Sequence, residues 1–127
     1  MIVLDFLNEF EVNDTSQLFI ILETRHKNDA NSFWLSKEQN SYPKLAILAR
    51  GDLNTLTYFP AWGGAAFRSI GNIQDNRGGN TIFYLDEDGM KETVPNQLIV
   101  LSSTGLKAAE EFLMTMDLPK SIEWIKI

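Results

Sequence analysis

The sequence lacks cysteine altogether and has one histidine, His26, among 127 residues. Without cysteine, the chain has no disulfides, thiolate metal sites or cysteine nucleophiles. A metal site built on one histidine would need carboxylate ligands, and no metal-binding motif pairs them with His26. His26 lies near the expected end of a helix, where the helix dipole favours a cation, so we expect a structural role for it. Neither a metal nor a cofactor is expected.

Basic residues are also scarce. The chain has 11 Lys and Arg against 17 Asp and Glu, which gives a formal net charge of −6. Direct binding of nucleic acid needs clustered basic side chains, so nucleic acid is not expected as a partner. An acidic surface instead favours encounter with a basic partner.

Long apolar runs and targeting signals are missing too. The N-terminus has no basic region before its apolar residues and soon acquires Asp5 and Glu9, unlike a signal peptide. No uncharged apolar run approaches the roughly 20 residues of a membrane span. We therefore expect a cytoplasmic protein with no membrane partner. Its 44% hydrophobic and 22% charged residues are typical of a globular domain, and residues 1–127 are expected to form one.

Short strands joined by turns dominate the expected structure. The clearest hairpin joins residues 44–50 and 53–59 across Gly51-Asp52. Further strands are expected at 2–7, 32–37, 81–85, 90–94, 97–101 and 121–127. Because hairpins pair strands antiparallel, the predicted class is α+β. We expect a mainly antiparallel sheet of about seven to eight strands with two helices packed on it.

Two segments are predicted to be helical. Asp14 and Gln17 resemble a capping box at the start of the first, although the apolar run 18–22 fits a buried strand equally well. The last helix follows the capping hydroxyls of Ser102–Thr104 and ends before Pro119. Its apolar stripe consists of Leu106, Ala109, Leu113 and Met116.

No pattern in the sequence predicts catalysis. There is no G-x-S-x-G elbow, and the glycine pairs 63–64 and 78–79 match no phosphate-binding loop. The consecutive acids Asp86, Glu87 and Asp88 join two strands, which favours a turn over a calcium loop. An enzyme that uses paired Asp and Glu residues is the least favoured interpretation, and would require a carboxylate with a raised pKa.

Aromatic residues in the central bend are candidates for contact. Trp62 lies in a glycine-rich bend near Arg68 and Arg77, and either core packing or an interface explains it. Trp34 and Trp124 are expected in the core.

The order of these features resembles immunity protein family one of bacterial polymorphic-toxin systems. The likeness runs from about Pro43 to Trp124. It is carried by Leu56, Tyr58, Phe67, Ser69, Gly71, Pro95, Ala109, Phe112, Leu113, Pro119 and Trp124. Several of these are expected in the core. Met116-Asp117 stands where a glycine helix cap would be expected.

The resemblance implies a non-enzymatic cytoplasmic antidote. It would bind the C-terminal domain of a cognate toxin, a basic deaminase or nuclease domain, and cover its active site. The candidate toxin-binding residues are Trp62, Arg68, Asp75, Arg77, Asp86, Glu87 and Asp88. The alternative is a small-molecule or peptide-binding α+β domain, with an apolar pocket lined by Tyr58, Trp62 and Phe67.

Overall fold

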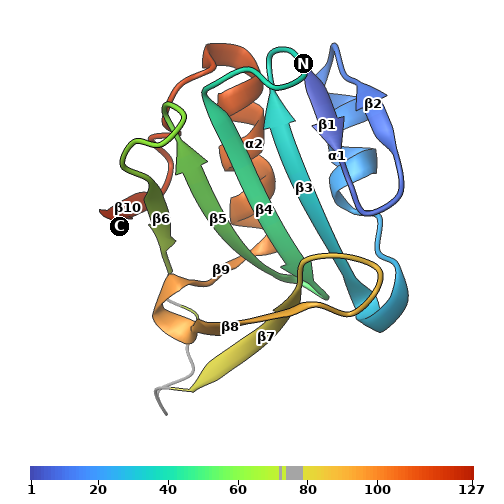
Figure 1. The fold of residues 1–127 in the computed structure, drawn as a ribbon, viewed down its shortest axis with the longest axis vertical. Coiled ribbons are helices and arrows are strands. Elements are labelled where there is room, and N and C mark those ends of the chain that lie inside the picture. The colour runs from blue at the N-terminus through green and yellow to red at the C-terminus, as the bar shows by residue number, and fades with distance from the viewer. Residues whose placement is uncertain (72, 74–78) are drawn as a thin grey trace.

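The computed structural model describes residues 1–71, 73 and 79–127, which form ten strands and two α-helices (Figure 1). The strands are β1 (Ile2–Leu4), β2 (Glu9–Glu11), β3 (Ala30–Ser36), β4 (Lys44–Arg50), β5 (Leu53–Phe59), β6 (Phe67–Ile70), β7 (Asn80–Tyr84), β8 (Lys91–Pro95), β9 (Val100–Leu101) and β10 (Glu123–Lys126). The helices are α1 (Thr15–Leu22) and α2 (Ser102–Thr115), and short 3-10 turns cover Lys27–Asp29 and Asn96–Leu98.

Eight of these strands form one sheet, in the order β10-β6-β5-β4-β3-β1-β2, with β9 paired to β5. Every pairing in it is antiparallel. Strands β7 and β8 form a separate hairpin. The predicted α+β class is confirmed.

The predicted central hairpin is formed by β4 and β5. Seven residue pairs join the two strands, from Lys44↔Phe59 to Arg50↔Leu53. Gly51 at the turn has φ +57°, a left-handed conformation that glycine adopts without steric cost. Successive side chains alternate between the two faces, so Leu45, Ile47 and Ala49 point into the main core.

Both helices cover the same face of the sheet (Figure 1). Leu18 and Leu22 of α1 and Phe112 of α2 are buried there against the apolar side chains of β3, β4 and β5. The helical prediction for α1 is confirmed, and the Asp14 side chain accepts a hydrogen bond from Gln17 N at 2.9 Å. The Gln17 side chain accepts from Asn13 N at 3.0 Å rather than from Asp14 N. Neither α-helix in the described residues has the length and apolar character that a membrane crossing needs.

The β7–β8 hairpin covers only one end of the opposite face (Figure 1). Phe83, Val94 and Ile99 are completely buried there in a second, smaller core. Two side chains of the sheet also hold the hairpin: Arg50 Nη1 donates to Ile82 O at 3.1 Å, and Ser32 Oγ donates to Leu85 O at 3.2 Å. Neither described α-helix covers the remainder of that face (Figure 1).

Several details differ from the expectation. Strands β2 and β6 were not predicted, and the expected strand at 97–101 is reduced to β9 because Asn96–Leu98 forms a 3-10 turn. Helix α2 has Leu101 at its N-cap position, so Ser102–Thr104 form its first turn and do not cap it. At its other end Met116 has φ +51°, the left-handed conformation for which a glycine was expected.

Candidate interaction surface

Three of the residues that carry the family resemblance surround a fourth, Tyr58. Its ring lies 6.4 Å from that of Phe67, 6.3 Å from that of Phe112 and 6.5 Å from that of Trp124, between centroids. Burial raises the pKa of the Tyr58 hydroxyl, and Asp117, which accepts its hydrogen bond, raises it further. Trp124 Nε1 donates to Pro119 O at 2.7 Å. These side chains pack β5, β6, α2 and β10 against one another, which explains their presence without a binding role.

Ser69 and Gly71 connect β6 to the segment before α2. The buried Ser69 hydroxyl accepts from Leu56 N at 3.0 Å and donates to Leu98 O at 2.9 Å. A Cβ on Gly71 would lie 1.5 Å from Ile99 O, so only glycine permits this close crossing. The expectation that several motif residues are core residues is confirmed.

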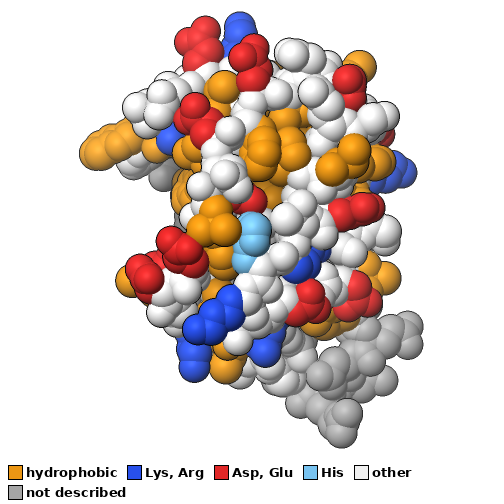
Figure 2. Space-filling model, turned by 90° about the vertical axis from the view of Figure 1, so that its right-hand side faces the viewer, with side chains coloured by type: hydrophobic (Ala, Val, Ile, Leu, Met, Phe, Trp, Pro, Cys, Tyr) orange, Lys and Arg blue, Asp and Glu red, His pale blue; other side chains and the backbone are white. Residues whose placement is uncertain are grey.

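His26 has a structural partner other than the one expected. Helix α1 ends at Leu22, so the helix dipole does not explain His26, and its structural role comes from Asp5 instead. Its Nε2 lies 3.2 Å from Oδ2 of Asp5, whose side chain is only 2% exposed. Burial opposes ionisation of Asp5, but hydrogen bonds, the strongest from Leu7 N and Asn8 N, outweigh it and lower its pKa. The pair ties the β1–β2 turn to the segment before β3 (Figure 2, where His26 is pale blue).

Trp62 is exposed, not packed. It lies in the β5–β6 loop with 83% of its surface accessible, so the core-packing explanation is wrong. Tyr58 is buried in the main core on the helix side of the sheet, with 5% of its surface accessible. None of the three hollows described below is lined by Tyr58, Trp62 or Phe67, so the pocket expected for a ligand-binding domain is not found among them.

Trp34 was expected in the core, and the structure corrects this. It is 43% exposed on the sheet face opposite the helices. Its neighbours in β3, Phe33 and Leu35, point to the helices, so the alternation of a strand turns Trp34 to the other side. There its ring stacks on that of Phe59, with centroids 5.6 Å apart. The sequence did not reveal which face of the sheet Trp34 would occupy, because its neighbours in the strand are also apolar.

The strand registers place Trp34 in a row that crosses the sheet. Paired side chains of an antiparallel sheet lie on the same face. The pairs Leu4↔Trp34, Trp34↔Ala46, Ala46↔Thr57 and Thr57↔Arg68 therefore form one line, which ends at Glu9 on β2 and Ile125 on β10. In the next line Lys44 pairs with Phe59. We call the surface formed by Leu4, Trp34, Lys44, Ala46, Thr57 and Phe59 the open face; Trp34 is its exposed residue, Thr57 is buried and the other four are half-buried.

A hollow of about 290 Å³ adjoins Trp34 on this surface. Its lining includes Ile2, Leu4, Tyr42 and Lys44. The Lys44 ammonium lies 5.9 Å from the Trp34 ring centroid and 5.0 Å from that of Tyr42, within reach of a cation–π interaction with each.

Arg68, a predicted contact residue, borders the open face. Its Nη2 forms an ion pair with Glu92 Oε1 of β8 at 3.0 Å, and its Nε donates to Thr57 Oγ1 at 3.1 Å. Arg68 thus links the β7–β8 hairpin to the sheet, and its charge already has a partner.

The three predicted acids form the β7–β8 turn, but they differ in role. Asp86 Oδ1 accepts from Asp88 N at 3.0 Å and from Met90 N at 3.1 Å, so Asp86 shapes the turn. Glu87 and Asp88 are exposed and form no ion pair within the described residues. Asp75 and Arg77, the other two candidates, lie outside the described residues. The described part contains no group of three or more His, Asp or Glu side chains that could hold a metal ion.

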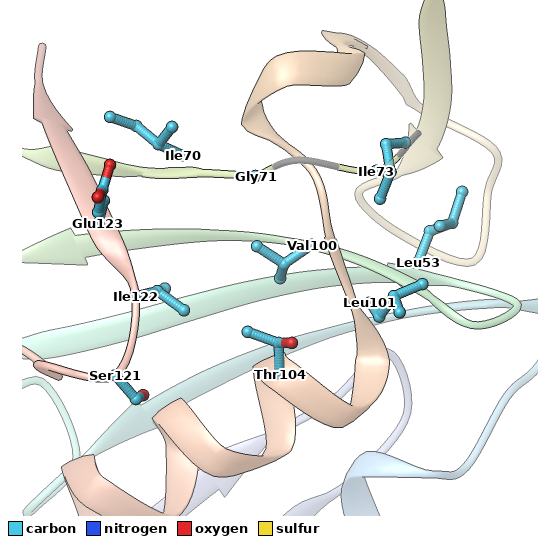
Figure 3. A pocket seen from close by; sticks show the side chains of 10 residues that line it. All are labelled: Leu53, Ile70, Gly71, Ile73, Val100, Leu101, Thr104, Ser121, Ile122 and Glu123. Atoms are coloured by element: carbon cyan, nitrogen blue, oxygen red, sulfur yellow. The ribbon is translucent and has the colours of Figure 1, made fainter. Parts of the chain in front are cut away.

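Two further hollows lie away from the open face. The larger, of about 500 Å³, is lined by residues of β6, β9, α2 and β10 together with Leu53 and Ile73, and most of them are apolar (Figure 3). Its one acidic residue, Glu123, has no second carboxylate beside it in the lining. The other, of about 360 Å³, lies between the end of α1 and the start of α2. Arg25 lines it and donates to Leu22 O and Gly51 O, which fastens α1 to the β4–β5 turn.

No family model matches the chain. One curated protein, the double-stranded DNA deaminase immunity protein of Burkholderia cenocepacia, is 29% identical over 123 residues, which are 97% of either chain. The resemblance to immunity proteins is thereby confirmed. This chain is similar, along almost its whole length, to an immunity protein of a toxin system.

Proposed function

We propose that this protein is a non-enzymatic immunity protein that binds the deaminase domain of a cognate toxin and neutralises it by covering its active site. The observation that carries the proposal is the match with a deaminase immunity protein over 97% of both chains. The sequence left a deaminase and a nuclease open, and this relative favours the deaminase.

The charge of the chain supports a partner of this kind. A domain that acts on DNA must offer basic side chains to the phosphates. This chain carries a net charge of −6, which favours fast association with such a surface.

The two described carboxyl groups whose pKa is clearly shifted are not shifted in the direction that acid–base catalysis favours. A general acid or base works best with a pKa near the working pH, which for a carboxyl group requires a raised pKa. Two carboxyl groups in the described part have a clearly shifted pKa, Asp5 and Glu111, and both are shifted downward. Burial acts against ionisation of Glu111, and hydrogen bonds from Lys120 N and Ser121 N prevail over it.

Co-expression with the toxin C-terminal domain encoded beside this gene tests the proposal. We expect rescue of growth, a stable one-to-one complex and loss of cytosine or adenine deamination on a DNA substrate. A toxic domain that stays toxic and forms no complex would refute it. The ligand-binding alternative would then gain weight, and the apolar hollow of about 500 Å³ would be its first candidate site.

A further inference from the structure

We infer that the toxin docks on the open face of the sheet, and that its nucleic-acid-binding surface is the part that docks. This inference rests on the proposed function and adds to it the contact surface and the chemistry of the partner's side.

The first argument is the exposure of an aromatic pair. Trp34 is 43% exposed while its ring stacks on Phe59. One end of the same sheet face is covered by the β7–β8 hairpin, which leaves Trp34 uncovered. Both α-helices lie on the other face of the sheet, so neither of them covers Trp34 (Figure 1). Tryptophan is enriched among residues that dominate binding energy, especially at the centre of an interface.

The second argument is the state of the cations on and beside this face. Arg68 is paired with Glu92, and Lys44 lies over the rings of Trp34 and Tyr42. Arg50, farther along β4, donates to Ile82 O and lies 5.3 Å from the Tyr84 ring centroid. These three cations are therefore engaged within the protein, whereas Lys91 of β8 is exposed and forms no ion pair within the described residues.

The carboxylates at the margins are not engaged in this way. Glu9 ends the row of side chains on β2, and Glu87 and Asp88 protrude from the β7–β8 turn; all three are exposed. None forms an ion pair within the described part of the chain. An exposed tryptophan bordered by carboxylates without ion pairs suits arginine and lysine, because guanidinium groups stack on tryptophan and pair with carboxylates. These are the residues with which a deaminase domain would hold DNA phosphates.

The third argument is the position of the exposed candidates from the sequence. Trp62 lies in the loop that follows Phe59 at the end of β5, and the acidic turn is held beside β3 by the bond from Ser32 to Leu85. Trp62 thus follows a strand of the open face in the chain, and the acidic turn is bonded to another of its strands.

The test measures affinity for the toxin domain with variants on the two faces. Trp34→Glu should weaken binding at least about 30-fold, the loss typical of a central hot spot. The matched controls are Ile20→Glu on α1 and Met114→Glu on α2, which are 71% and 76% exposed on the helix side. They should change affinity by less than about threefold. Normal affinity of folded Trp34→Glu, or a loss confined to the controls, would overturn the inference.

Folding of each variant is checked by its thermal melt. If Trp34→Glu fails to fold, Trp34→Ala and the pair Glu87→Lys with Asp88→Lys decide the matter. The lysine pair should slow association several-fold and reduce its dependence on salt. An unchanged association rate for the pair together with unchanged affinity of Trp34→Ala would overturn the inference.

The identity of the occupant is tested by competition with DNA. A DNA oligonucleotide should displace the wild-type protein from the toxin, since both would use one surface. A stable ternary complex of DNA, toxin and this protein would contradict that claim. Failure of the wild-type protein to bind the toxin at all would refute the proposed function itself, so the two failures are distinguishable.

Discussion

Trp34 stacks on Phe59 across β4, with ring centroids 5.6 Å apart, on the sheet face opposite both helices. The strand between them presents the small side chain of Ala46 and the long stem of Lys44 at this point, which leaves room for the two rings to meet. The opposite side of the same strands is buried under α2. One face of the sheet is therefore buried under the helices, and the other is covered by the β7–β8 hairpin at one end and exposes Trp34 beyond it.

Phe112 should be a main source of stability. It is completely buried and its ring meets the edge of Tyr58 at 6.3 Å. Phe112→Ala should lower the free energy of unfolding by about 3–5 kcal/mol, measured by urea denaturation. Met114→Ala, on the exposed side of the same helix, serves as the control and should stay within about 0.5 kcal/mol of wild type. A small effect of Phe112→Ala would mean that α2 is not packed as described.

Gly71 should tolerate no side chain. A Cβ there would lie 1.5 Å from Ile99 O, and neither backbone segment can move without disturbing the Ser69 hydrogen bonds. Gly71→Ala should destabilise the fold by at least about 2 kcal/mol in the same denaturation assay. At Gly64 the nearest atom to an added Cβ is 3.8 Å away, so Gly64→Ala should be close to neutral. Equal effects of the two substitutions would contradict this crossing.

Asp5 should make stability depend on acid pH. Its pKa is lower in the folded protein than its ordinary value of 3.8, so its contribution is complete above that value. The contribution is lost as the pH falls through the folded pKa. Asp5→Asn should cost about 1–3 kcal/mol at pH 7, because an amide nitrogen or oxygen replaces a buried carboxylate that accepts two backbone hydrogen bonds.

The difference between wild type and Asp5→Asn should shrink as denaturation is repeated toward pH 3 and below. Asp88→Asn removes the same charge at an exposed position and should show little effect at either pH. A difference for Asp5→Asn that stays constant with pH would argue against an ionised Asp5 in the native state.

Asp86 and Glu87 should differ although they are adjacent. The Asp86 carboxylate holds the amides of Asp88 and Met90, so Asp86→Ala should accelerate hydrogen exchange at both amides by about tenfold. Glu87→Ala should leave exchange unchanged, because the Glu87 side chain is exposed and forms no ion pair within the described residues. Charge reversal at Glu87 therefore suits binding experiments better than charge reversal at Asp86, because it changes the charge without disturbing the turn.

Local patterns in the sequence were sufficient for much of the fold. The β4–β5 hairpin follows from two apolar strands around Gly51, and α1 begins where Asp14 caps it. Strand β2 was missed because three residues carry too little periodicity, and β6 because its pairing with β10 is a contact between distant segments. The left-handed Met116 was likewise hidden, since a non-glycine cap gives no local signal.

The sequence by itself determined the class of the protein. The absence of cysteine, the single histidine and the net charge of −6 excluded many chemistries, and the order of motifs indicated an immunity protein. Only the tertiary structure decided which residues are available for contact. An aromatic residue in a strand is equally apolar on either face, and the position of the helices buries one face and exposes the other. That difference turned Trp34 from an expected core residue into an exposed residue of the open face, and the loop after β5 left Trp62 in solvent.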